Sequence, residues 1–201
     1  NIRYKTSSPL SLLKPGSVFS GVQKSGTDEY PVTIEVQSVD IERSKFCGYL
    51  SIQNLTEEFP SVSTYFESEI IGDRYSFITN KWESDYQNDM EHWTKFSESK
   101  QENCILNTVL NEHKDDINNV KFNPINKDFI YMRWKEMFLV PDHKVKNIEG
   151  ISFCGFYYIC FNVSTGNIQG YYYHPSANEK FQELHLNYQS NQYQFAEFEF
   201  R

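Results

Sequence analysis

The chain has 201 residues, which suits one domain with a sizeable hydrophobic core. Its formal net charge is −8 and no basic stripe appears, which argues against a nucleic-acid partner. No apolar run reaches membrane-spanning length, so we expect no membrane partner either. Aromatic residues make up 16% of the chain, a share that favours β structure.

Cysteine usage indicates neither a metal site nor a disulfide framework. None of the four cysteines forms a C-x-x-C pair, and no histidine lies at ligand spacing from them. We therefore expect no metal, no cofactor and reduced thiols, as in a cytoplasmic protein. The cysteines are Cys47, Cys104, Cys154 and Cys160.

The N-terminal part of the chain predicts a series of strands. Residues 1–11 are polar and expected to be loose, Leu12–Gly21 reads as an anchored lead-in segment, and Gln23–Asp28 reads as a turn. Clear two-residue alternation of apolar and polar residues follows. The expected strands span Tyr30–Val39, Phe46–Ile52 and Val62–Ile71, with a fourth at Tyr75–Thr79.

A polar insert, residues 80–127, interrupts the strands and is rich in Asn, Asp, Glu and Lys. Met90, Trp93 and Phe96 follow a three-residue spacing, and the apolar residues of Ile105–Leu110 follow helical spacing. We expect two short helices that lie on the outside of the sheet.

The strongest strand signal lies in Phe129–Phe161, where two apolar runs flank a Pro-Asp turn and a linker. In the first run Arg133 and Lys135 mark one face as solvent. The opposite face is then the interior, and it carries Ile130, Met132, Trp134, Glu136, Phe138 and Val140. Burying a carboxylate costs several kcal/mol unless something pairs with it, so Glu136 is the first candidate for a functional residue. The alternatives are an ion pair with a cation such as Arg74, or a carboxylate bonded by backbone groups.

The second run, Gly150–Phe161, offers a companion for this carboxylate. If Tyr157 faces inward, it brings a phenol close to Glu136 in an apolar socket, where the two groups provide what a bound ammonium needs. The alternative is a core tyrosine that bonds a backbone carbonyl. The residues that share its face are Phe153, Gly155, Ile159 and Phe161.

The remaining pattern favours a sandwich or a closed barrel, and a small barrel has room for one ligand at its mouth. Asn167–His174 is a further strand, and Pro175–Glu183 is a turn with a possible short helix. The run GFYYICF is apolar on both faces, so its outer face needs a cover that the inserted helices could supply.

Motifs of enzymes are absent: the sequence contains no G-x-S-x-G, no phosphate-binding loop and no H-E-x-x-H. Glu67 and Glu69 share a strand face that we expect to point to water. We expect no catalytic activity. The histidines, all expected in solvent, are His92, His113, His143, His174 and His185.

Three motifs carry a resemblance to a known family: MRWKEMFLVPDH at Met132–His143, SFCGFYYICF at Ser152–Phe161 and GYYYH at Gly170–His174. They resemble the vacuolar import and degradation family, the substrate-receptor subunits of the GID/CTLH E3 ubiquitin ligase. Further matches are PGSVFSGVQKS at Pro15–Ser25, CGYLSIQNLTEEFP at Cys47–Pro60 and YFESEII at Tyr65–Ile71, so that the resemblance runs from about Leu12 to Arg201. The Asn-rich insert favours a fungal member.

The resemblance implies an all-β fold, an antiparallel β-barrel of about eight strands that is lipocalin-like and has short inserted helices. It also implies that the barrel mouth binds proteins beginning with proline, the Pro/N-degron, or other hydrophobic N-termini, for ubiquitin-dependent degradation. Glu136 would take the charged amine, Tyr157 would hydrogen-bond beside it, and Gln23 would hold the peptide backbone from a loop. Ser152 and Phe153 begin the strand that lines the pocket. The residues implied for its apolar wall are Val32, Leu50, Leu55 and Tyr172.

The implied organisation is a flexible segment at 1–11 and one barrel domain at 12–201, with the insert at 80–127 and a docking tail at 192–201. Phe198, Phe200 and Arg201 would dock the receptor onto the scaffold subunit of the ligase. The implied location is the cytoplasm, extending to the nucleus. Two other hypotheses stay open: a lipocalin-like carrier of a small apolar ligand, and a scaffold whose barrel is only structural. Against the carrier hypothesis, this sequence lacks the Gly-x-Trp signature that is expected in the first strand of a lipocalin.

Overall fold

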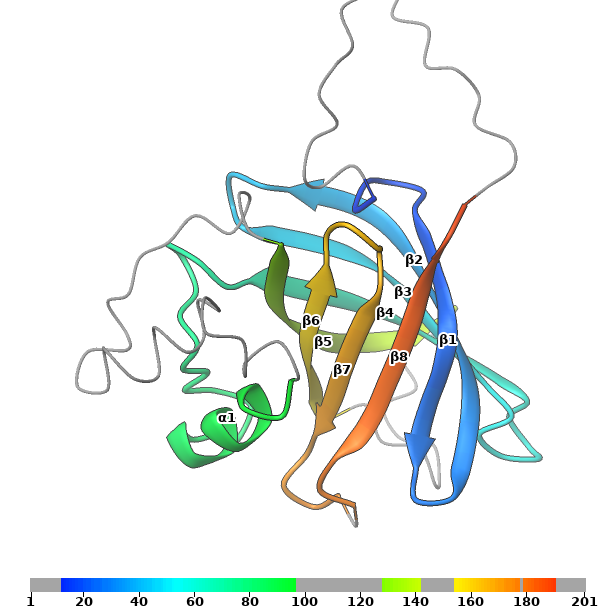
Figure 1. Ribbon diagram of the computed structural model, residues 1–201. Coiled ribbons are helices and arrows are strands. Elements are labelled where there is room, and N and C mark those ends of the chain that lie inside the picture. Colours follow the sequence, from blue (N-terminus) through cyan, green and yellow to red (C-terminus); the bar gives the residue numbers. More distant parts are fainter. Residues whose placement is uncertain (1–11, 97–127, 142–153, 178, 191–201) are drawn as a thin grey trace, which may run out of the picture.

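The computed structural model describes residues 12–96, 128–141, 154–177 and 179–190 (Figure 1). Eight antiparallel strands form a closed barrel in which each strand pairs with the next along the chain and β8 pairs with β1. This confirms the predicted barrel and rules out the sandwich. The strands are β1 (Val18–Ser25), β2 (Asp28–Asp40), β3 (Lys45–Gln53), β4 (Ser61–Ile70), β5 (Phe129–Val140), β6 (Phe156–Asn162), β7 (Ile168–Tyr173) and β8 (Gln182–Gln189).

Alternation correctly predicts the strands of the first meander. In β2 the side chains of Val32 and Ile34 are buried, and in β3 the same holds for Leu50. Ile34 lies directly opposite Leu50 in the register of the two strands, so both point into the barrel. The period of two in the sequence therefore assigns the inner face of these strands without tertiary information.

β1 lies where we expected a lead-in segment and a turn. β1 covers part of Leu12–Gly21 and continues through Gln23, which the sequence had placed in a turn. β1 pairs on both sides, and at Gly21 a Cβ would lie 1.9 Å from the carbonyl oxygen of His185 on β8. Only glycine fits such a close approach of two backbones. Gly21 made the segment look irregular in the sequence, but it is the residue that allows β1 to pair with β8 and close the barrel.

β8 and the segment Tyr75–Thr79 are the other differences. β8 has only two fully buried apolar residues, Leu184 and Leu186, and is held by pairing with its neighbours. Tyr75–Thr79 does not form the expected fourth strand; it is irregular, and its Phe77 is buried against the outside of the barrel.

A β-bulge in β5 reverses the predicted faces at its end. Tyr65 pairs with Phe138, but the next residue, Phe66, pairs with Glu136, so that Met137 is an extra residue. Phe138 is consequently 39% exposed and Leu139 is buried in its place. The predicted inward positions of Phe138 and Val140 are wrong, whereas that of Glu136 is correct because it precedes the bulge.

The barrel has two apolar layers, one inside it and one on its outer face. Trp134 packs inside against Phe66, with ring centroids 5.0 Å apart. Outside, α1 (Tyr86–Trp93) and the segment before it cover β5 to β7, where the Trp93 ring packs edge-on against Tyr158 (Figure 1). This confirms the first predicted helix and its place over the outer face of β6. The second expected helix, at Ile105–Leu110, lies outside the described residues.

This cover turns two predicted surface charges into buried ones. Arg133 is only 1% exposed, and its guanidinium pairs with Glu69 at 3.2 Å and donates to the Ser76 carbonyl at 2.9 Å. Glu69 also pairs with Lys81. The expectations that Arg133 and Glu69 face water are therefore wrong, because α1 and the segment before it bury this face of the strands.

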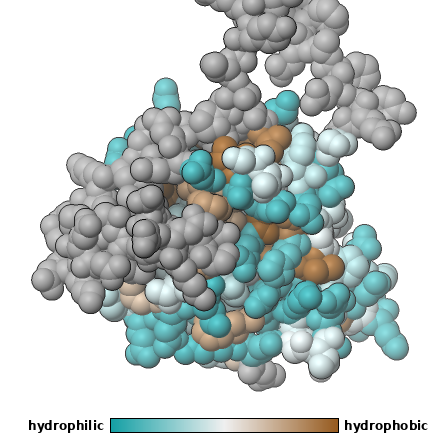
Figure 2. Space-filling model, viewed as in Figure 1, coloured by the Kyte–Doolittle hydropathy of each residue, from teal (hydrophilic) through white to brown (hydrophobic). Residues whose placement is uncertain are grey.

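The surface of the described residues is mostly hydrophilic on the face that Figure 2 shows, with apolar side chains gathered in a few places. Within the described ranges, no helix has the length and apolar character needed to span a membrane. The large apolar side chains that stand exposed there are Tyr86, Met137 and Phe138.

Candidate functional site

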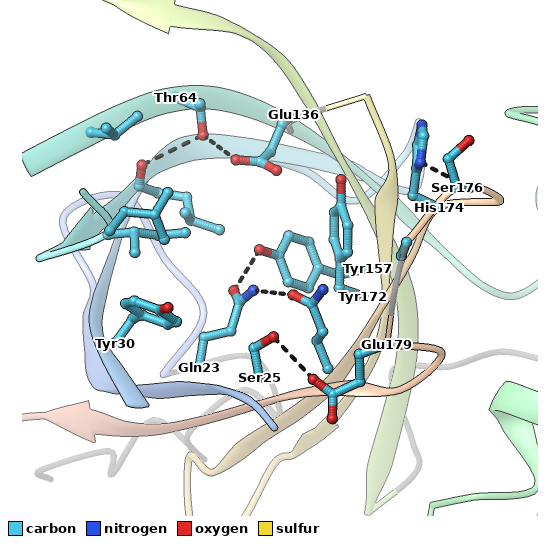
Figure 3. Close-up of a pocket in the computed structure, with 16 residues that line it drawn as sticks. Gln23, Ser25, Tyr30, Thr64, Glu136, Tyr157, Tyr172, His174, Ser176 and Glu179 are labelled. Atoms are coloured by element: carbon cyan, nitrogen blue, oxygen red, sulfur yellow. Dashed lines mark hydrogen bonds between the residues drawn. The ribbon is translucent and has the colours of Figure 1, made fainter. Parts of the chain in front are cut away.

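A cavity of about 490 Å³ opens at one end of the barrel (Figure 3). Residues from the inner faces of the strands form its base, and the connections β3–β4 and β7–β8 contribute to its walls. The lining residues are Gln23, Ser25, Tyr30, Leu50, Ile52, Leu55, Val62, Thr64, Glu136, Tyr157, Tyr172, His174, Ser176, Ala177, Glu179 and Gln182.

Glu136 lies in this cavity and is 5% exposed. Its Oε1 accepts a hydrogen bond of 2.7 Å from the hydroxyl of Thr64 on β4, and no other described side chain donates to it. Burial raises the pKa of Glu136 to about 7, against the opposing effects of the Thr64 hydrogen bond and of Lys135. The cavity thus holds a carboxylate that is only partly compensated and that titrates near neutral pH.

The alternative of an ion pair does not apply within the described chain: no Lys or Arg there lies within salt-bridge distance of Glu136. The neighbouring cation, Lys135, is on the opposite face of β5, where its Nζ donates to the carbonyls of Cys154 and Gly155 at 2.8 and 2.9 Å. Lys135 therefore affects Glu136 only through the field of its charge.

Tyr157 brings its phenol into the same cavity and is 1% exposed. Its hydroxyl donates to Gln23 Oε1 at 2.8 Å, and Gln23 Nε2 donates in turn to Gln182 Oε1 at 3.1 Å (Figure 3). Burial first, and then the charge of Glu136, raise the pKa of Tyr157 well above its usual value, so the hydroxyl stays neutral. Since the O–H is engaged with Gln23, the phenol oxygen is left to accept from a ligand.

The other predicted residues are placed as follows. Gln23 lies on β1, 7% exposed, rather than in a loop. Leu50, Leu55 and Tyr172 line the cavity, whereas Val32 belongs to the barrel core and is not among the lining residues. Ser152, Phe153, Phe198, Phe200 and Arg201 lie outside the described residues.

Sequence reasoning missed Thr64, Gln182 and the residues of the β7–β8 connection. Thr64 carries a signal that could have found it, since it is a polar residue between Val62 and Phe66 on the inner face of β4. Gln182 had no such signal because its strand was not recognised. Of the histidines expected in solvent, His92 is fully buried. His174 lines the cavity and accepts from the Ser176 amide through Nδ1.

The arrangement is suited to a cationic ligand with N–H donors and an apolar body. A carboxylate supplies a charge-assisted acceptor, the phenol oxygen supplies a second, and Leu50, Ile52 and Leu55 form an apolar wall. Across the described ranges no group of three or more His, Cys, Asp or Glu side chains could hold a metal ion. The fold and the site are those of a small β-barrel with a ligand cavity at its mouth.

Residues 12–189 match the family described as Vacuolar import and degradation protein, and the chain belongs to that family. It is 46% identical over 178 residues to the glucose-induced degradation protein 4 homolog of Mus musculus, covering 89% of this chain and 78% of that protein. It is 36% identical to the GID complex substrate-recognition subunit 4 of Schizosaccharomyces pombe, covering 88% and 91% of the two chains.

Its identity to the subunit of the same name in Saccharomyces cerevisiae is 34%, over 87% of this chain and 61% of that protein. The chain thus spans less than two thirds of the budding-yeast relative. Identity to the mouse protein exceeds identity to these two yeast proteins, and a fungal origin stays a prediction from the Asn-rich insert.

Proposed function

We propose that this protein is the substrate receptor of a multisubunit E3 ubiquitin ligase and that it binds proteins through an N-terminal proline. Two yeast relatives are named substrate-recognition subunits of the GID complex, which supports the receptor role. The single observation that carries the proposed specificity is the buried carboxylate of Glu136 at the base of a cavity that has an apolar wall.

A free N-terminal amine is the partner that this carboxylate lacks. At neutral pH the amine is an ammonium, and its charge compensates Glu136 while its N–H groups donate to the carboxylate. A charge-assisted hydrogen bond of this kind is worth about 1.5–3 kcal/mol. An internal peptide segment or an acetylated N-terminus has no such charge, so the site selects for a free chain end.

Proline matches the number of acceptors as well as the charge. Its ammonium is secondary and has two N–H donors, for which Glu136 and the Tyr157 oxygen are two acceptors. A primary ammonium has a third donor that needs a further acceptor in a buried place, where an unsatisfied donor costs about 1–3 kcal/mol. The compact apolar ring of proline fits against the Leu50, Ile52 and Leu55 wall. Other hydrophobic N-termini enter with a lower affinity.

We propose further that the barrel acts as a binding subunit without catalysis in the cytoplasm and in the nucleus. The captured protein is then ubiquitylated by other subunits of the ligase. In this proposal residues 12–201 form one receptor domain, and the tail at 192–201 docks onto the scaffold subunit through Phe198, Phe200 and Arg201.

The test is a titration of a fluorescent peptide that begins with free proline against the wild-type protein and the variant Glu136→Gln. We expect at least about tenfold weaker binding for the variant, because one charge-assisted bond is lost. Glu35→Gln is the matched control, since Glu35 is exposed on β2 and absent from the cavity lining. Equal affinity of all three proteins would refute the proposal. An apolar small molecule that co-purifies with the protein would favour the carrier instead.

A further inference from the structure

The connection between β7 and β8 forms one wall of the cavity. Its described residues, 174–177 and 179–181, are called the wall loop here. His174, Ser176, Ala177 and Glu179 of this loop line the cavity, and Gln182 follows directly at the start of β8. On the cavity side the loop is tied to β1 by the Ser25 hydroxyl, which donates to Glu179 Oε2 at 3.0 Å.

The other side of the wall loop rests on α1. The Phe181 ring lies 5.0 Å from the imidazole of His92, and the Lys95 ammonium just after the helix stands 3.7 Å from the centre of the Phe181 ring. Lys180 forms an ion pair with Glu91 on the same helix. Phe181 is thus held between an aromatic ring and a cation that both belong to the insert.

α1 itself is fixed to the barrel by contacts that are almost wholly buried. His92 is fully buried and stacks on Tyr158 of β6 at 4.5 Å, and the imidazole meets Tyr173 edge-on at 5.3 Å. The Asp89 carboxylate accepts from the Tyr158 hydroxyl at 2.8 Å and from the Thr79 amide at 2.7 Å. His92 and Asp89 thus connect the helix to β6, to β7 and to the segment before the helix, so α1 is a firm support for the wall loop.

Figure 1 shows α1 beside the end of β7 at which the wall loop begins. The base of the cavity is held mainly by the strands, and the Gln23 side chain also donates to Gln182 at the start of β8. Glu136, Tyr157 and Gln23 lie on β5, β6 and β1, and the strand register holds them in place. The site therefore consists of a base built on strands and a wall built on a loop that packs against the insert.

We propose that α1 is a positioning element of the binding site. It holds the wall loop and thereby determines how tightly the residues after the first one of a bound peptide are retained. The identity of the ligand in this inference rests on the proposed function. The support of the wall loop by α1 does not rest on it.

The experiment compares Phe181→Ala with the control Phe138→Ala, which removes the same ring from an exposed site on β5. Two probes are titrated: prolinamide, which reaches only the base, and a five-residue peptide that begins with proline. We expect Phe181→Ala to weaken binding of the peptide about fivefold or more and to change the affinity for prolinamide by less than about twofold. An effect of this size is typical of a residue that acts on a ligand through another part of the protein. The control leaves both affinities unchanged.

Hydrogen exchange over residues 174–182 provides a readout without ligand. We expect faster exchange of this segment in Phe181→Ala and in the double variant Glu91→Ala/Lys95→Ala, which acts from the side of the insert. Unchanged exchange in both variants, or equal weakening of prolinamide and of the peptide, would overturn the inference. If the wild-type protein binds neither probe, the proposed function fails, and the exchange data still decide whether α1 holds the loop.

Discussion

Replacing Glu136 by glutamine should stabilise the free protein at neutral and alkaline pH while it weakens ligand binding. The pKa of Glu136 rises from its ordinary value of 4.5 to about 7 on folding, mainly because the side chain is buried. One pH unit of difference corresponds to about 1.4 kcal/mol, so the charged carboxylate opposes folding by about 3 kcal/mol. Glutamine has no charge to bury, and its Oε1 can still accept from the Thr64 hydroxyl.

The pH window follows from the two pKa values. Below pH 4.5 the carboxyl group is protonated in both the folded and the unfolded chain, and burial then costs no charge. As the pH rises, the unfolded chain loses the proton first, and stability declines until the folded carboxyl has also ionised above about 7. The advantage of Glu136→Gln should therefore be small at pH 4.5 and reach about 3 kcal/mol at pH 8.

Urea unfolding at these two pH values measures the difference directly, with Glu35→Gln as a control that changes an exposed carboxylate. Equal destabilisation of the variant at both pH values would contradict this prediction, because Glu136 would then be a structural carboxylate with satisfied partners. A stabilised variant that has lost binding is the pattern of a residue retained for function at a cost in stability.

Three further predictions concern the pH dependence, the phenol and the buried ion pair. Affinity for a peptide with free N-terminal proline should fall up to about tenfold for each pH unit below 7, since Glu136 must be ionised to bind the ammonium. An affinity that stays constant from pH 5.5 to 7.5 in anisotropy titrations would contradict this. Tyr157→Phe should weaken binding of the same peptide by about tenfold or more, because the second acceptor is lost and Gln23 Oε1 loses its donor. An unchanged affinity in calorimetry would show that the phenol does not contact the ligand. Glu69→Ala should lower the free energy of unfolding by about 3–5 kcal/mol, measured with urea, since it leaves the buried Arg133 without its carboxylate. The control Glu67→Ala on the same strand should lower it by less than about 0.5 kcal/mol. Similar losses for the two variants would show that the ion pair contributes little to stability.

The candidate site could be predicted from the sequence where one residue contradicted its surroundings. Glu136 stands out because a single carboxylate falls on the apolar face of a strand, and the structure places it on that face. The bulge at Met137 could not be foreseen, because an extra residue in one strand is defined only by the register with β4. The prediction of the inner face was therefore correct before this residue and wrong after it.

Contacts between distant parts of the chain account for the other differences. β1 and β8 carry few apolar residues and are strands because each has a partner on both sides. Arg133 looked like a surface cation because nothing in its own strand shows that α1 and the segment before it cover this face. The sequence of a strand indicates which residues share a face, but whether that face meets water depends on segments far away in the chain.

Calorimetric titration tests most directly whether the cavity binds a free N-terminal proline. The wild-type protein is titrated with two short peptides that differ only at the first residue, one with free proline and one with the same proline acetylated. Acetylation removes the positive charge and the N–H donors while it keeps the ring and the rest of the peptide. The account predicts binding of the free peptide alone, because only an ammonium can pair with the Glu136 carboxylate. Equal binding of the two peptides, or binding of neither, would contradict it.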